Sequence, residues 1–237
     1  MPSDLKPVVA ALVARVTAVL AEHPLRTFLA SAYVFGSALG PRYRPESSDF
    51  DVQLVLEDTE EPRAALIAIQ ELGHDLVALG ALDVNAAFVS EALRKVPSRA
   101  FIYNEIAIRG RLIYGRDTLP RDRALAWRDL ADEVIFDARE YRRIYLGTRD
   151  PVWRALLAKR APLLFLQLAL LLDTVTEDID EAIALLVTRF PTLRPHTAAF
   201  EAACHEPGER ALLEALLVTY EVLRDFCEQQ AASEGNG

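Results

Sequence analysis

The sequence predicts an α+β fold in which a small mixed, strongly twisted sheet with flanking helices is followed by an all-helical bundle. Up to Gly115, short apolar runs with strand character alternate with helical segments. From Pro120 onward no convincing strand remains, and apolar residues recur at helical spacing. We therefore expect two domains, residues 1–117 and residues 118–237.

Composition indicates a globular protein. The chain has 237 residues, of which 51% are hydrophobic and 26% charged. Its formal net charge of -9 argues against duplex nucleic acid as a partner. No apolar run is long enough to span a bilayer and no signal peptide is visible, so we expect a cytoplasmic protein without a membrane partner. Cys204 and Cys227 are too few for a disulfide framework and are expected to be buried, reduced thiols.

Chain breakers and hydrophobic periodicity define the elements of the first half. Pro24 ends the first helix, Gly36 stops the first strand, and Gly73 is expected to cap the second helix. We expect the helices to lie on one side of the sheet. In order, the predicted elements are a helix at 4–22, a strand at 30–35, a turn-rich segment at 37–48, a strand at 50–56, a helix at 61–72, a strand at 81–89, partly helical structure at 90–109 and a strand at 112–114.

The second half carries clear helix signals. Asp178, followed three residues later by Glu181, is a capping-box pattern that opens a helix. Pro151 is a favourable first helical residue, and Pro162 should kink or split the helix that follows it. The predicted helices occupy residues 121–146, 151–172, 178–190, 196–204 and 208–230.

Polar residues interrupt the apolar pattern where the first strand ends and the second begins. Gly36 and Ser37 follow the first strand, and a glycine-serine turn lets backbone N–H groups approach a phosphate closely. Asp49 and Asp51 are two apart and therefore point to the same side of the strand, away from its apolar face. Two such carboxylates repel each other unless a cation lies between them. Oxygen-only ligation on a rigid strand suits Mg²⁺.

Asp83 adds a third carboxylate on the next predicted strand, where Asn85 shares its face. A charge between the apolar Leu82 and Val84 needs a partner. If this strand pairs with the strand at 50–56, three carboxylates converge. This arrangement is what two-metal phosphoryl transfer requires.

The order and spacing of these motifs resemble the DNA polymerase beta-like nucleotidyltransferase superfamily. The matching residues are Phe35-Gly36-Ser37, then eleven intervening residues, then Asp49-Phe50-Asp51 and the later Asp83. Residues 105–115 are similar to the closing segment of that family. The resemblance covers about residues 5–117 and is greatest to the minimal and the aminoglycoside-type nucleotidyltransferases.

The resemblance implies a reaction and a role for each motif residue. A nucleoside monophosphate, AMP from ATP, would pass to a hydroxyl of a small molecule, with the helical half binding that acceptor. Asp49 and Asp51 would bind two Mg²⁺ ions, and Asp83 would bind the catalytic ion and take the hydroxyl proton. The nucleotide-binding candidates are Gly36, Ser37, Arg42, Arg44 and Ser48, with the choice between the two arginines left open.

Two other functions fit the same motifs. The chain could be an antitoxin-type or regulatory nucleotidyltransferase that acts on a partner protein, or an idle nucleotide-binding module. The resemblance to the small-molecule branch also implies that a carboxylate of the helical half could serve as general base, although an exposed helix face is the favoured explanation of these residues. The candidates are Asp129, Asp132, Glu133, Asp137 and Glu140.

Overall fold

The computed structural model describes residues 5–40, 43–45, 48–79, 82–93, 100–119, 162–172, 174, 176–205 and 210–234. The chain divides into two compact units. Unit 1 comprises Met1–Val96 and Ile102–Ala124, and unit 2 comprises Pro97–Phe101 and Leu125–Gly237. The domain boundary that we expected between residues 117 and 118 stays a prediction.

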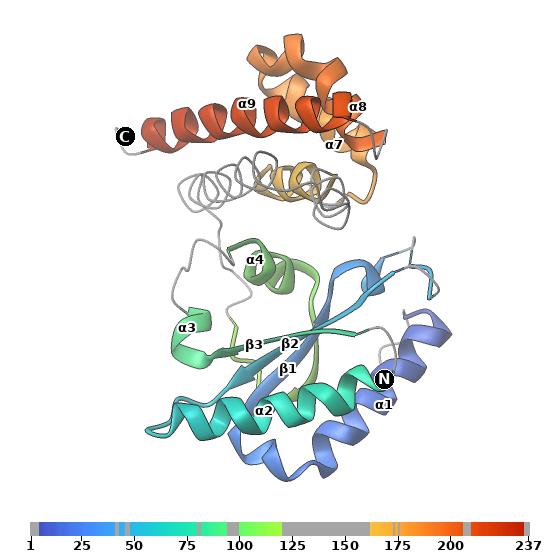
Figure 1. The fold of residues 1–237 in the computed structure, drawn as a ribbon, viewed down its shortest axis with the longest axis vertical. Helices are drawn as coiled ribbons and strands as arrows, with labels where there is room; N and C mark the ends of the chain where they lie inside the picture. Colours follow the sequence, from blue (N-terminus) through green and yellow to red (C-terminus); the bar gives the residue numbers. More distant parts are fainter. Residues whose placement is uncertain are drawn as a thin grey trace. The chain divides into compact units, whose positions relative to one another are not determined.

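Unit 1 contains a four-stranded mixed sheet (Figure 1). Its strands are β1 (Leu29–Phe35), β2 (Phe50–Leu56), β3 (Leu82–Phe88) and β4 (Arg111–Gly115), arranged in the order β3-β2-β1-β4. β1 is antiparallel to both β2 and β4, whereas β2 and β3 are parallel. A parallel pair needs a crossover, which α2 (Pro62–Val77) provides. The predicted α+β class with a mixed sheet is confirmed.

One face of the sheet packs against α1 (Pro7–Glu22) and α2 (Figure 1). The strands contribute alternate apolar residues to this face, as a period of two requires. The fully buried members of this core include Val16 and Leu20 of α1, Val34 of β1, Val52 and Leu54 of β2, and Leu72 and Leu76 of α2.

The opposite face is also covered, by the short α3 (Val89–Leu93) and by α4 (Ala100–Arg109). Tyr103 and Ile106 of α4 pack against Tyr33 and Val55 of the sheet. Our expectation that helices lie on one side only is therefore wrong. Apart from the half-buried Asp51, β2 is buried along its whole length, which one covered face cannot achieve.

The end predicted for α2 is also wrong, because the helix continues past Gly73 to Val77. Leu72 and Leu76 lie four apart and both enter the core, so packing favours a further helical turn. A mid-helix glycine costs about 1 kcal/mol relative to alanine, which core packing can outweigh.

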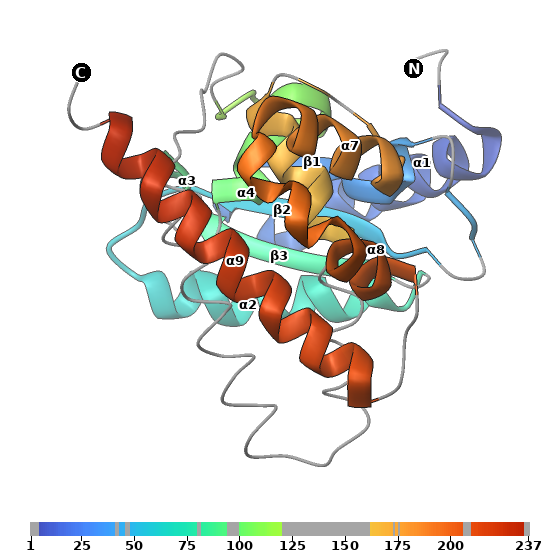
Figure 2. The same cartoon turned by 90° about the horizontal axis from the view of Figure 1, so that it is seen from above.

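The described residues of unit 2 form helices joined by short connections, without a strand among them (Figure 2). Its core contains Phe165, Leu186, Phe200 and Leu223. Its described elements are a helix at 162–171, α7 (Ile179–Arg189), the 3-10 helix η4 (Pro191–His196), α8 (Thr197–His205) and α9 (Arg210–Glu234).

The predicted helix at 121–146 and the kink at Pro162 depend on residues outside the described ranges. Within those ranges, every helix is too short or too polar to cross a membrane.

Candidate functional site

The backbone of Gly36 lies close to a candidate catalytic carboxylate. It follows β1 directly and has a φ of 71°, a conformation that glycine adopts without steric cost. A Cβ atom at this position would lie 2.1 Å from Oδ2 of Asp51. The carboxylate of Asp51 therefore lies against the backbone of Gly36, where only a glycine leaves room for it.

Ser37 ties this turn to the start of β2. Gly36 and Ser37 begin the short 3-10 helix η2 (Gly36–Leu39), which leaves the end of β1. The exposed Ser37 hydroxyl donates a hydrogen bond to the backbone carbonyl of Asp49, at 3.2 Å. This bond brings the glycine-serine turn beside the two aspartates of β2, as the motif spacing predicted.

Asp51 and Asp83 face each other across neighbouring strands. Their Cα atoms are register partners in the parallel β2–β3 pair, so both side chains leave the same face of the sheet. Neighbouring strands are about 4.8 Å apart. Asp51 is half-buried and Asp83 is exposed. β2 therefore pairs with β3, and this pairing was the condition for these two carboxylates to converge.

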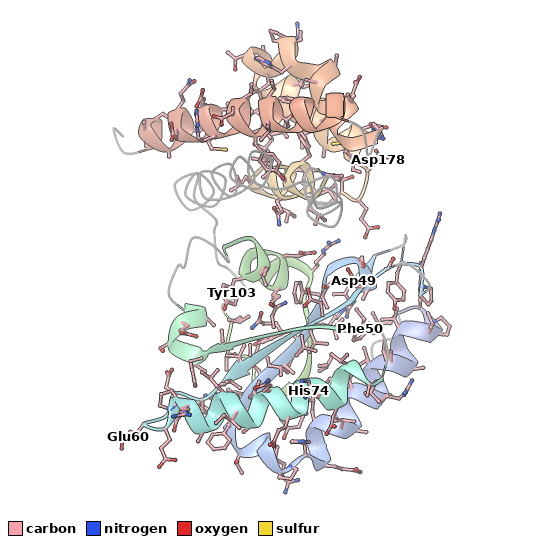
Figure 3. All side chains as sticks on the ribbon, viewed as in Figure 1. Asp49, Phe50, Glu60, His74, Tyr103 and Asp178 are labelled. Atoms are coloured by element: carbon pink, nitrogen blue, oxygen red, sulfur yellow. The ribbon has the colours of Figure 1, made fainter. Side chains whose placement is uncertain are left out.

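Asp49 lies just before β2 and is exposed. In Figure 3 it lies on the side of the sheet that α4 and Tyr103 occupy, whereas Phe50 lies toward α2. Phe50 is fully buried in the core of α1 and α2, which fixes the direction in which its neighbours point.

The donor atoms at this edge of the sheet suit a hard divalent cation. They are all oxygens, and Mg²⁺ in phosphoryl-transfer sites needs only one or two carboxylates, with water and phosphate completing its octahedron. Asp51 and Asp83 are in register and could form such a pair, and the carboxylate of Asp51 occupies the space that a Cβ of residue 36 would need. Within the described ranges, no three His, Cys, Asp or Glu side chains form a group that could hold a metal ion. The assignment of all three aspartates as metal ligands stays a prediction.

The loop between η2 and β2 is anchored by Tyr43, which is buried in the core of α1 and α2. Lys6 Nζ donates to the Tyr43 carbonyl at 3.3 Å. Immediately after it, Arg44 and Ser48 close a turn: the Ser48 N–H donates to the Arg44 carbonyl at 2.7 Å, and the Arg44 N–H donates to Ser48 Oγ at 3.0 Å. The arginine side chain is exposed beside this turn.

These contacts distinguish Ser48 from Arg44 as candidate nucleotide ligands. Ser48 Oγ already accepts a hydrogen bond within the turn, so this side chain stabilises the loop. Ser48 also directly precedes Asp49. Arg44 is exposed and available to an anion. Arg42 and the five carboxylates proposed as general bases lie outside the described residues.

Sequence reasoning missed a polar layer that continues from the site into the sheet. Gln53 of β2 has Asn85 of β3 and Tyr33 of β1 as register partners. Gln53 and Tyr33 are fully buried and Asn85 is half-buried. The one signal in the sequence was the glutamine itself, which interrupts the otherwise apolar run from Val52 to Leu56.

Tyr33 joins this layer to the segment that leaves β4. Its hydroxyl donates to Asp117 Oδ1 at 2.7 Å and accepts from the N–H groups of Thr118, at 2.7 Å, and Leu119, at 3.2 Å. Ser31 and Thr118 share a further hydroxyl contact of 2.6 Å. The exit from the sheet is therefore fixed by hydrogen bonds that are buried or partly buried.

The four-stranded sheet and its flanking helices have the fold of a solved nucleotidyltransferase, as the resemblance predicted. No family model matches the sequence, and no curated protein matches it. Among solved structures, the chain is similar to spectinomycin adenyltransferase AAD(9) from Enterococcus faecialis, crystallised with ATP and spectinomycin. The TM-score is 0.57 at 15% identity, over 92% of this chain and 99% of that chain.

A second solved structure covers less of the chain. It is a mutant of the toxin-antitoxin MntA-HpeT, which matches 55% of this chain and 91% of its own with 17% identity and a TM-score of 0.31. The likeness to the adenyltransferase extends over both units of the chain.

Proposed function

We propose that this protein transfers a nucleoside monophosphate, AMP from ATP, to a hydroxyl of a small molecule. The observation that carries the proposal is the register of Asp51 with Asp83, with Asp51 lying against the positive-φ backbone of Gly36. This places two carboxylates beside a turn whose N–H groups can receive phosphate oxygens. The adenyltransferase of similar fold was crystallised with ATP and a small-molecule acceptor, which supports the same pair of substrates here.

In the proposed reaction, the acceptor hydroxyl oxygen forms a bond to the α-phosphorus of ATP. The bond from that phosphorus to the oxygen bridging to the β-phosphate breaks, and pyrophosphate leaves. Asp83 is exposed, so its carboxylate is accessible to take the hydroxyl proton. Mg²⁺ held by Asp49, Asp51 and Asp83 would supply charge neutralisation when bound.

The residues of the turn position the nucleotide. The Gly36 and Ser37 backbone and the Ser37 hydroxyl would bind the triphosphate, and Arg44 would neutralise phosphate charge from the neighbouring loop. Much of the rate enhancement in phosphoryl transfer comes from such positioning. Unit 2 would bind the acceptor, and the net charge of -9 favours a neutral or cationic acceptor over a nucleic acid.

The test uses the full chain, ATP labelled at the α-phosphate, Mg²⁺ and a panel of hydroxyl-bearing small molecules. Transfer of label to one acceptor, with release of pyrophosphate, is the expected result. Asp51→Asn keeps the shape of the side chain but removes its charge, and should lower transfer by at least about a hundredfold, since the lost group acts in the transition state. Transfer at the wild-type rate by this variant would refute the proposal.

Glu57→Gln is the matched control. Glu57 directly follows β2 at the end opposite to Asp51, where it pairs with Arg116 through a hydrogen bond of 2.7 Å. That hydrogen bond keeps the pKa of Glu57 below its ordinary value. Removing this carboxylate changes the charge next to the same strand without touching the site, so activity should be retained. Label found in a protein of a cell extract instead of a small molecule would favour the regulatory alternative.

A further inference from the structure

A buried amide beside the site has an acceptor atom that the fold leaves unused. Gln53 is 0% exposed, and its Nε2 donates to the Leu54 carbonyl at 2.9 Å. Because a carbonyl can only accept, this bond fixes which end of the amide is the oxygen. No hydrogen-bond donor in the described part of the chain reaches Gln53 Oε1. A buried acceptor without a donor is costly, and such costs concentrate at functional sites.

The neighbours of Gln53 explain why the fold does not satisfy it. Tyr33, its partner on β1, donates its hydroxyl proton to Asp117. Val55, the next residue on the same face of β2, is apolar and lies in the core beneath α4. On β2 and β3 themselves, the adjacent polar residues on this face are the site carboxylate Asp51, which is two residues away, and Asn85.

The two parallel strands repeat one polar pattern in register. Asp51 and Gln53 of β2 lie opposite Asp83 and Asn85 of β3, so a carboxylate pair is followed by a carboxamide pair on one face. Carboxylates suit a cation, and Mg²⁺ retains several water ligands, which are strong hydrogen-bond donors. An acceptor one step behind the carboxylates is where such a water finds a partner.

We propose that Gln53 is a positioning residue that accepts a hydrogen bond from a water ligand of the divalent cation held by Asp51 and Asp83. The proposal rests on the cation site of the proposed function. The unpaired oxygen of the glutamine then destabilises the metal-free protein, and in the metal-bound protein the same oxygen stabilises the bound cation. Removing the amide should therefore weaken cation binding without weakening the fold.

The experiment measures the Mg²⁺ affinity of the full chain without nucleotide, from the competition of Mg²⁺ with Mn²⁺ detected by electron paramagnetic resonance. Gln53→Met has a similar length and no amide oxygen, and should bind Mg²⁺ about tenfold more weakly or worse. Its melting temperature in EDTA should stay close to that of the wild type, because the substitution removes an unpaired buried acceptor together with the hydrogen bond to the Leu54 carbonyl. Gln53→Glu keeps the acceptor oxygen and should bind at least as tightly as the wild type.

Thr219→Val is the matched control, since Thr219 Oγ1 is also buried and lacks a hydrogen bond but belongs to unit 2. Its Mg²⁺ affinity should be that of the wild type. Wild-type affinity in Gln53→Met would overturn the inference, and so would a lower melting temperature in EDTA combined with unchanged affinity. If Asp51→Asn abolishes binding but Gln53→Met does not, only this inference fails. If the wild type binds no divalent cation, the proposed metal site fails with it.

Discussion

Replacing a glycine of this chain by alanine should have opposite effects on stability at two positions, because their surroundings differ. Gly36 has a positive φ and leaves no room for a Cβ beside Asp51, whereas nothing beyond the adjacent residues and nearby backbone of its own helix lies within 4 Å of the Cβ position of Gly73. Alanine at position 36 should destabilise unit 1 by at least about 1–2 kcal/mol and displace the Asp51 carboxylate. Mg²⁺ binding should fall with it.

Alanine at position 73 should do the reverse. This glycine lies inside α2 and uses none of its conformational freedom, so Gly73→Ala should stabilise the protein by about 0.5–1 kcal/mol. Denaturant unfolding of both variants measures the two effects. Equal shifts of the same sign would show that neither the close approach at Gly36 nor the helical position of Gly73 matters.

A buried hydroxyl holds the exit of the sheet. Tyr33→Phe removes the partner of two backbone N–H groups, of Thr118 and Leu119, together with the donor to Asp117. Leaving buried groups unpaired costs about 1–3 kcal/mol. Hydrogen exchange at the two amides should accelerate, and the free energy of unfolding should fall by that amount. Unchanged exchange at both amides would contradict the role assigned to this hydroxyl.

At the scale of the element, α7 begins by a cap that the sequence predicted in part. The Asp178 side chain accepts hydrogen bonds from the N–H groups of Asp180, at 3.0 Å, and Glu181, at 3.3 Å. A full capping box would return a bond from Glu181 to the Asp178 N–H. That N–H instead donates to Thr176 Oγ1, at 3.0 Å, and the threonine hydroxyl donates to Glu181. The hydroxyl of Thr176 thus connects the Asp178 N–H to the Glu181 carboxylate, in place of a direct hydrogen bond between them.

This connection through Thr176 predicts unequal effects of two substitutions. Asp178→Ala removes the acceptor of both helix N–H groups and should destabilise unit 2 by about 1 kcal/mol. Glu181→Ala should cost less, because Thr176 still accepts from the Asp178 N–H after the glutamate is gone. Thermal unfolding followed by circular dichroism compares the two. A larger loss for Glu181→Ala than for Asp178→Ala would favour the ordinary capping box.

At the scale of the whole molecule, local sequence patterns predicted the features that depend on nearby residues. Alternation placed β2 at its observed bounds, and the Gly36-Ser37 turn and Asp49 lie together as their spacing indicated. The burial of Gln53 could not be predicted, because it depends on which strands pair and on α4 covering the second face. The predicted end of α2 was wrong for the same reason, since core contacts that are distant in sequence outweigh the preference of Gly73 to end a helix.

Two thiols contribute to the stability of the molecule at alkaline pH, and both belong to the core of unit 2 or pack against it. Burial raises the pKa of Cys204 to about 12, with a smaller effect of Asp180, and that of Cys227 to about 12, with a smaller effect of Glu228. Their ordinary value is 9.0. Between these values the unfolded chain releases thiol protons that the folded chain retains. Stability should therefore be unaffected by these groups below pH 9 and should fall as the pH rises from 9 toward 12.

The same shift predicts that the native thiols are chemically inert. At pH 8 the folded protein should react with iodoacetamide at least about a hundredfold more slowly than the chain in guanidinium chloride, since only the thiolate reacts. Replacing both cysteines by alanine creates a cavity at Cys227 and lowers the baseline stability, so the informative quantity is the slope of unfolding free energy against pH. The wild type should lose stability more steeply than this variant above pH 9, by up to about 1.4 kcal/mol per pH unit for the fully buried Cys227. Parallel slopes, or rapid alkylation of the native chain, would mean that neither thiol is held protonated by the fold.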